Sequence, residues 1–412
     1  KLDGSLSFEG EISGYINVWF ITQEQIANHI DFIECQSDPS CDETIEFPGY
    51  EIPQDFLTWP AQGAEGYDEN LAPFNDVTFD GVYTPQSGDY PAICGDFSTY
   101  TIWNDLGVDG STIDGNEIGL EVHTIVYGYS TLEESDQNTL FVQHKLINRG
   151  STTLSDTYAG FWADIEIGDG NDDYIGTDVA RRMYYGYNSV PIDNGTATSN
   201  GYGEDLPVIG VKILSGALAD ANGEDDNPAY QSFYANETSG YDDGIIDNER
   251  LGLSSSMYHN NNIGPQSTRD PQSAAEYYNY LNGAWRNGDQ LTFGGIGYIQ
   301  GPASAPLAKY AFPGESDPLF SGTDGIDPEF EGDGGWTEEN VAATSGGDRR
   351  MLGSTGPFTF APGDVQVIDL PTRWKVVNAS HYLQSYSAMR SCPSRISPKF
   401  IQIQLITSSQ LI

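Results

Sequence analysis

The chain has 412 residues, with 61 Asp and Glu against 17 Lys and Arg, which gives a formal net charge of −44 at pH 7. This acidity excludes nucleic acid and anionic membranes as main partners, because both require basic patches. Hydrophobic residues at 38% and aromatic residues at 12% argue against wholesale disorder. The length allows two or three domains, or one large β architecture. No apolar run reaches the roughly 18 residues that a membrane-spanning helix needs.

Residues 1–95 are predicted to form an N-terminal region of strands and loops that packs on the core. Apolar and polar residues alternate over residues 1–25, a pattern typical of strands. Thr22, followed by Gln25, predicts a short capped helix. Frequent Pro and Gly indicate ordered loops over residues 48–95.

The four cysteines are unevenly spaced. Cys35 and Cys41 are close enough in the chain to close a small loop, so we predict a disulfide between them and an oxidising compartment. Cys94 and Cys392 have no evident partner in the pattern. No CxxC pair, haem attachment motif or zinc pattern is present.

Residues 96–370 are predicted to form the main β-sandwich region, with acidic loops. Its strand-like segments are 98–104, 118–129, 138–148, 156–167, 207–214 and 356–370. Short strands separated by turns favour a mainly β fold: a large β-sandwich or jelly-roll-like architecture with long ordered loops and one or two short helices. The best helix candidate begins after Ser273, has Glu276 in its first turn and ends at Gly283.

Residues 371–412 differ from the rest of the chain. No acid follows Asp369, whereas five basic residues do: Arg373, Lys375, Arg390, Arg395 and Lys399. Three interpretations stay open, namely a separate basic module, a separate strand, or a sequence error such as a shifted reading frame. We base no functional prediction on this segment.

Carboxylates clustered in flexible loops suit Ca²⁺, which takes six to eight oxygen ligands, and three clusters occur here. In the first, Asp76 and Asp80 match positions of a calcium-binding loop, but no Glu stands at the twelfth position, so Asp89 is the residue that would close the site. The second contains Asp164, Glu166, Asp169, Asn171, Asp172, Asp173 and Asp178. The third contains Asp242, Asp243, Asp247 and Glu249.

The second cluster directly follows an apolar segment at 158–162, so its carboxylates are expected to gather at one end of a sheet. Like charges held close together raise one another's pKa unless a cation neutralises them. Calcium is therefore the predicted cofactor. The alternative for each cluster is an acidic turn in solvent.

No catalytic signature is found, and the chain is predicted not to be an enzyme. It lacks a GxSxG elbow, a phosphate loop and a dinucleotide fingerprint, and its five His are scattered. Paired carboxylates leave glycoside hydrolysis open, although no spacing singles out an acid and its partner. Arg349 and Arg350 are predicted to form buried or half-buried salt bridges rather than an anion site.

Several motifs follow one another over roughly residues 15–370. They include Trp59-Pro-Ala-x-Gly, Asp156-Thr-Tyr-x-Gly-x-Trp162, Asp242-Asp-Gly-x-x-Asp247 and Gly347-Asp-Arg-Arg-Met-Leu. In this order they resemble a group of mostly uncharacterised secreted proteins of Bacteroidetes-type bacteria that often end in a type IX secretion sorting domain. The resemblance implies export to the cell surface or the medium, and further β domains beyond this region. It implies no catalytic residues.

These observations favour a secreted, calcium-stabilised extracellular structural or adhesive protein, such as a subunit of a cell-surface layer or filament. That role implies self-association into a homo-oligomer or filament. The alternatives are a calcium-dependent glycan-binding module, with exposed aromatic residues, and a polysaccharide-degrading enzyme, with two acids in a cleft. The expected location is extracellular or at the cell surface.

Overall fold

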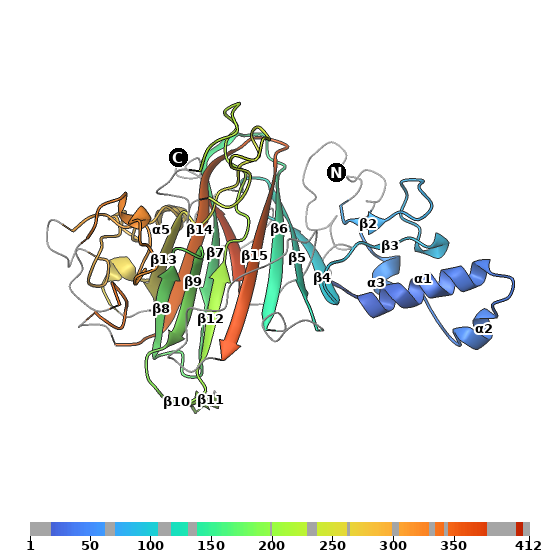
Figure 1. The fold of residues 1–412 in the computed structure, drawn as a ribbon, viewed down its shortest axis with the longest axis horizontal. Coiled ribbons are helices and arrows are strands. Elements are labelled where there is room, and N and C mark those ends of the chain that lie inside the picture. The colour runs from blue at the N-terminus through green and yellow to red at the C-terminus, as the bar shows by residue number, and fades with distance from the viewer. Residues whose placement is uncertain are drawn as a thin grey trace. The chain divides into compact units, whose positions relative to one another are not determined.

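The computed structural model describes residues 18–61, 71–105, 117–130, 138–197, 200–228, 237–261, 264–298, 305–328, 334–341, 345–376 and 401–406, with only the backbone of 371–376 and 401–406. The fold is mainly β, as the sequence predicts (Figure 1). The described residues form two compact units. The first comprises those of Lys1–Val108 and Gly119–Ser151, and the second those of Asp109–Ile118, Thr152–Ala388 and Pro398–Ile412.

Within the first unit, four antiparallel strands pair in the order β1-β4-β5-β6. Their bounds are β1 Trp19–Thr22, β4 Phe97–Asn104, β5 Leu120–Gly128 and β6 Thr139–Asn148. Trp19 lies opposite Tyr100, and Tyr100 lies opposite Ile125. These side chains pack with Phe56 and Trp59 into a buried aromatic core. The strands form because alternate residues can enter this core while their neighbours stay outside.

The segment between β1 and β4 contains short helices and turns. They are α1 Gln23–Ser37, α2 Glu43–Glu46, α3 Gln54–Leu57 and the 3₁₀ turn Pro85–Ser87, with strands β2 Phe74–Asn75 and β3 Tyr90–Pro91 pairing with each other. The capping box predicted for α1 is confirmed: Gln25 N donates to Thr22 Oγ1 over 3.1 Å, and Thr22 N donates to Gln25 Oε1 over 2.8 Å.

The cysteines of the first unit are oxidised. A disulfide joins Cys35 to Cys41, whose Cα atoms are 5.2 Å apart, within the usual range for such a bridge. Cys94 is disulfide-bonded as well, although the spacing gave it no evident partner. The bridge from Cys35 therefore ties the end of α1 to the segment that precedes α2.

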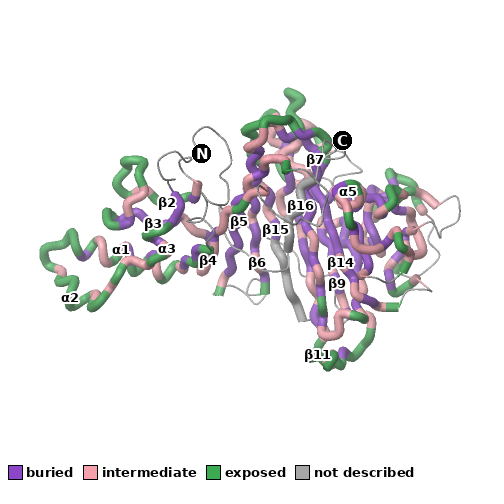
Figure 2. Tube along the Cα trace, turned by 180° about the vertical axis from the view of Figure 1, so that it is seen from behind, coloured by how far each residue is buried: buried purple, intermediate pink, exposed green. Residues whose placement is uncertain are grey.

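The second unit is a sandwich of two antiparallel sheets. In one, the strands of this unit pair in the order β15-β12-β9-β8, with β15 Val365–Val376, β12 Pro207–Lys212, β9 Met183–Asn188 and β8 Asp173–Asp178. The other has the order β13-β14-β7-β16, with β13 Ser255–Asn260, β14 Arg349–Phe360, β7 Leu154–Asp164 and β16 Ile401–Ile406. Their contact is close: Tyr184 on β9 donates its hydroxyl to Phe161 O on β7 over 2.6 Å. Figure 2 shows the buried residues along β7, β9 and β14.

Long connections complete this unit. They contain the hairpin of β10 Asp193–Gly195 and β11 Asn200–Gly203, the helix α5 Ala274–Leu281, and the 3₁₀ turns Gln266–Thr268 and Ser321–Thr323. The prediction for α5 is confirmed, because Ser273 caps it by accepting from Glu276 N over 3.3 Å. Figure 1 shows α5 beside β13 and β14. In the described part of the chain, no helix is both long and apolar enough to cross a membrane.

The predicted boundaries at residues 95 and 370 do not coincide with these units. The described residues on either side of residue 95 belong to the same unit, and β15 runs through residue 370. Within residues 371–412, the described backbone belongs to strands: the end of β15, and β16, which pairs Ile401 with Ala163 of β7. The expected strands within residues 1–17 lie outside the described residues.

Candidate functional site

The first predicted acidic cluster forms one loop of the first unit. Asp76 accepts the N–H of Gly81 over 2.8 Å and that of Asp80 over 3.3 Å, and the Gly81 hydrogen bond holds the pKa of Asp76 below its usual value. Asp89 is fully buried and accepts Val77 N and Thr84 N, each over 2.8 Å. These carboxylates therefore fasten the backbone of the loop that contains them.

The second predicted cluster divides into separate groups. Asp164 faces Arg350, with 3.3 Å between Oδ2 and Nε, and Asp178 faces Arg181, with 2.7 Å between Oδ2 and an Nη atom. An arginine thus compensates each of these two acids. Asp169 accepts the backbone and side-chain N–H groups of Asn171 over 3.1 and 2.9 Å.

The remaining acids of this region gather with a residue that the sequence analysis missed. We call Asp169, Asp172, Asp173 and Asp193 the carboxylate cluster. Asp193 begins β10, is 1% exposed, and accepts the N–H groups of Gly195, Asp169 and Tyr202. Sequence spacing gave no signal for it, because only the tertiary fold brings β10 beside the turn before β8.

Burial makes this cluster electrostatically costly. Asp173 is 0% exposed, and although its Oδ2 accepts Ile167 N over 3.2 Å, its Oδ1 has no hydrogen-bond partner. Asp172 Oδ1 is likewise buried without a partner. Burial first, and then the charges of Asp172, Asp193 and Asp169, raise the pKa of Asp173 to about 8. Among the described residues, no Lys, Arg or His forms an ion pair with the four acids.

The third predicted cluster joins two loops of the second unit. Asp247 accepts Asn222 N and Gly223 N over 2.7 and 2.8 Å, and Glu249 accepts Asp226 N over 2.7 Å. Asp243 stays within its own loop, where it accepts Ile245 N over 2.9 Å. For Asp242 the notable feature is a left-handed backbone, with φ of 52°.

The sequence prediction did not include the segment 222–226, which faces this third cluster. Asp225 accepts Gly244 N over 2.7 Å from the opposite loop, as Glu249 and Asp247 do in the other direction. A signal was present in the sequence, because Asn222-Gly-Glu-Asp-Asp226 has the same acidic, glycine-containing character as the predicted clusters. The two loops therefore cap each other's backbone.

No three His, Cys, Asp or Glu side chains within the described residues are positioned together as a set of metal ligands. Most predicted ligands instead accept backbone N–H groups or pair with arginine. The carboxylate cluster differs from them, because it retains buried carboxylate oxygens without a partner and has no compensating base. It is the group of acids to which a cation would contribute most.

The two arginines after Asp348 form the predicted salt bridges, and this prediction is confirmed. Arg349 binds the fully buried Glu338, with 2.7 Å between an Nη atom and Oε1. Arg350 donates to both carboxylate oxygens of Asp270, over 3.0 and 2.9 Å. Neither guanidinium is left to bind an anion.

One histidine–carboxylate pair has the composition of a catalytic dyad. His259 Nδ1 lies 2.7 Å from Asp270 Oδ1, and Trp162 Nε1 donates to His259 Nε2 over 3.1 Å. Because the indole already occupies Nε2, this histidine has no ring nitrogen left to take a proton from a substrate. Its geometry is that of a structural hydrogen-bond network.

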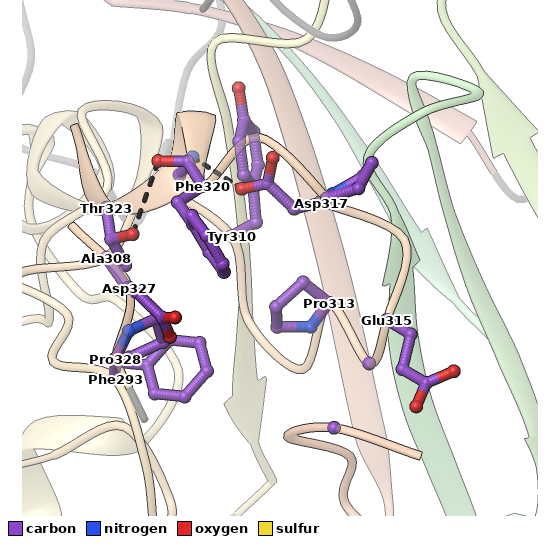
Figure 3. Close-up of a pocket in the computed structure, with 14 residues that line it drawn as sticks. Phe293, Ala308, Tyr310, Pro313, Glu315, Asp317, Phe320, Thr323, Asp327 and Pro328 are labelled. Atoms are coloured by element: carbon purple, nitrogen blue, oxygen red, sulfur yellow. Dashed lines mark hydrogen bonds between the residues drawn. The ribbon is translucent and has the colours of Figure 1, made fainter. Parts of the chain in front are cut away.

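The second unit also contains a pocket of about 250 Å³ (Figure 3). Its aromatic lining is provided by Phe293, Tyr310 and Phe320, and its acidic lining by Glu315, Asp317 and Asp327. Asp317 accepts Ser321 N over 2.8 Å and Gly322 N over 2.6 Å. No protein-family model matches the chain, and neither a curated protein nor a solved structure matches it.

Proposed function

We propose that the protein is a secreted, calcium-stabilised extracellular structural or adhesive protein. The observation that carries this proposal is the carboxylate cluster, in which Asp173 and Asp193 are buried and one carboxylate oxygen of each of Asp172 and Asp173 has no hydrogen-bond partner. A buried carboxylate without a counter-charge costs several kcal/mol, so a bound cation would stabilise the folded state. Ca²⁺ is favoured over Mg²⁺ because it tolerates irregular oxygen ligands from a loop, whereas Mg²⁺ requires a near-ideal octahedron.

Export is supported by covalent chemistry. The disulfide between Cys35 and Cys41 lies in a segment of short helices and loops, where a cross-link is useful because little core is available. Disulfides persist in oxidising environments and are rare in the cytosol of mesophiles. The resemblance to exported bacterial proteins supports the same location.

The hydrogen bonds of the acidic side chains support a structural role rather than a catalytic one. Asp89 accepts backbone N–H groups of its own loop, and Asp247 and Glu249 accept those of the facing loop. Carboxylates that accept backbone N–H groups stabilise the loops and are not presented to a substrate. We extend the proposal to self-association, as expected for a subunit of a surface layer or filament.

The test is thermal unfolding in millimolar calcium and in excess chelator. Calcium at 100 times its Kd adds about 2.7 kcal/mol to the free energy of unfolding, which corresponds to a Tm increase of about 5–10 °C. The variant Asp193→Asn should lose most of this increase. The matched control Glu51→Gln removes an exposed carboxylate of the first unit and should keep it. Equal Tm values of the unaltered protein in calcium and chelator would refute the calcium proposal.

Electron microscopy and light scattering of the same samples measure self-association. Ordered layers or filaments in calcium would support the subunit role. Monodisperse monomers in calcium, with the Tm increase present, would remove that role and leave the calcium proposal intact.

A further inference from the structure

The pocket of the second unit has an aromatic and acidic lining without basic residues. Its side chains offer aromatic faces, proline rings and carboxylates, and no Lys, Arg or His is among the residues that line it. In Figure 3, Asp317 and Asp327 lie on either side of Phe320, and Glu315 lies at the outer edge. A volume of about 250 Å³ is below the range of drug-sized sites and suits a small group or a single side chain.

The pocket is also poor in hydrogen-bond donors. The Tyr310 hydroxyl donates to Leu253 O over 2.9 Å, and the Thr323 hydroxyl donates to Ile326 O over 2.6 Å. Three proline residues of the lining have no backbone N–H to offer: Pro313, Pro318 and Pro328. The lining thus provides acceptors and π faces, and its two hydroxyl donors are already engaged.

The aromatic side of the pocket is held in place by its own loop. Phe320 has a left-handed backbone, with φ of 57°, a conformation that persists in a non-glycine residue only when its surroundings impose it. Asp317 imposes it here, since its carboxylate accepts the N–H groups of Ser321 and Gly322, immediately after Phe320. Asp317 is therefore a positioning residue, and Glu315 and Asp327 are the other two carboxylates of the lining.

We propose that this pocket binds the cationic side chain of a lysine or arginine presented by a basic polypeptide. An ammonium or guanidinium group has donors and no acceptor, which complements a lining of acceptors. The aliphatic stem of such a side chain can lie along the proline and phenylalanine surfaces, with its charge at the carboxylates. Aromatic faces attract the same cations. A neutral sugar fits less well, because its hydroxyl oxygens also require donors.

The net charge of the whole chain also favours the binding of cations. A net charge of −44 attracts cationic ligands from a distance and raises their rate of association. Specificity must still come from the pocket, because the overall field does not distinguish one exposed carboxylate from another.

The experiment measures binding of Nα-acetyl-lysine methylamide and Nα-acetyl-arginine methylamide by saturation-transfer NMR, with Nα-acetyl-norleucine methylamide as the neutral analogue of lysine. We expect the cations to bind about tenfold more tightly than the neutral analogue at low salt, with the difference shrinking as salt screens the carboxylates. The double variant Glu315→Gln/Asp327→Asn should lower the affinity for the cations about threefold to tenfold. The single variant Glu51→Gln changes an exposed carboxylate that does not line the pocket and should leave the affinity unchanged.

Three results would overturn the proposal: equal affinity for the neutral analogue, no binding of either cation, or binding of oligosaccharides with neither cation competing. The last would assign the pocket to glycans. Measurements in calcium and in chelator keep this test independent of the calcium proposal, because the pocket contains none of the carboxylate cluster.

Discussion

Arg349 is 5% exposed and needs several acceptors at once to remain charged in the interior of the second unit. Glu338 supplies one, Asn260 Oδ1 lies 2.7 Å from an Nη atom, and Ser345 O lies 2.9 Å from the other. Glu338 in turn accepts Ile175 N from β8 over 2.9 Å. The pair therefore links both sheets of the sandwich, because Arg349 and Asn260 belong to one sheet and Ile175 to the other.

Substitution of this arginine should be strongly destabilising. Arg349→Met leaves Glu338 buried without its counter-charge, and we expect the free energy of unfolding to fall by roughly 3–5 kcal/mol. Lys309→Met is the matched control, because it breaks the exposed pair with Asp324 at 2.6 Å and should cost less than about 1 kcal/mol. Denaturant unfolding of both variants provides the measurement. Similar losses in the two would contradict a special role for the buried pair.

At the scale of elements, the position of β10 depends on a glycine in the turn between β7 and β8. Gly168 has φ of 65°, and a Cβ atom there would lie 1.6 Å from Asp193 Oδ2. Any other residue would both strain the backbone and displace the Asp193 carboxylate. Gly203, at the end of β11, has the same φ of 65° but no atom within 4 Å of such a Cβ.

Comparison of the two glycines separates the cost of backbone strain from the cost of a steric clash. Gly203→Ala should lower the free energy of unfolding by about 1 kcal/mol, because a left-handed conformation disfavours a side chain. Gly168→Ala should cost about 1–3 kcal/mol more, because it also overpacks the turn against Asp193. Denaturant unfolding in the absence of calcium measures both losses. If the two variants unfold at the same denaturant concentration, the turn at Gly168 does not hold β10 in place.

The sequence predicted the elements that local patterns encode. Regular alternation located β4 to β7, and the capping residues Thr22 and Ser273 located α1 and α5. It missed β8 and β9, because their Gly, Asp and Tyr residues look like loop composition and become strands only by burial between neighbours. The helix α1 runs to Ser37 because tertiary contacts, such as that of His29 with Phe56, extend it.

The same limit applies to the candidate site. Asp173 could be selected from the sequence because it stands in a run of acids, whereas Asp193 stands alone in an Asp-Asn-Gly turn. Proximity between the two is a property of the folded chain. Conversely, Asp164 and Asp178 belong to the acidic run but lie beside arginines, which the spacing of acids could not reveal.

At the scale of the whole molecule, two pH effects oppose each other. Lowering the pH from 7 protonates exposed carboxylates, which reduces the self-repulsion of a chain with net charge −44 and stabilises it. Buried histidines act in the opposite direction. His144 on β6 is 4% exposed, its Nδ1 lies 3.0 Å from the Thr124 hydroxyl, and burial lowers its pKa from 6.5 to about 3.

The sign of the histidine effect follows from proton binding. Between pH 6.5 and about 3, His144 is protonated in the unfolded chain and neutral in the folded one, so the unfolded state binds more protons. The stability that the neutral histidine contributes is complete above pH 6.5 and is lost progressively as the pH falls towards 3. Glu121 adds a later loss: burial opposes ionisation, but His123 and Arg149 lower its pKa to about 2, so its contribution disappears between pH 4.5 and 2.

High salt separates the two effects, because it screens the exposed charges and leaves the buried group unaffected. At high salt we expect the stability of the first unit to fall between pH 6.5 and 4.5 by up to about 1.4 kcal/mol per pH unit, which is the contribution of one proton. Hydrogen exchange of β5 and β6 amides, corrected for the intrinsic pH dependence of exchange, measures this stability locally. His144→Gln removes one titrating group and should reduce the slope in this range, whereas His29 and His123, whose pKa values burial also lowers, continue to contribute. An unchanged slope in that variant would assign the acid sensitivity to other groups of the unit.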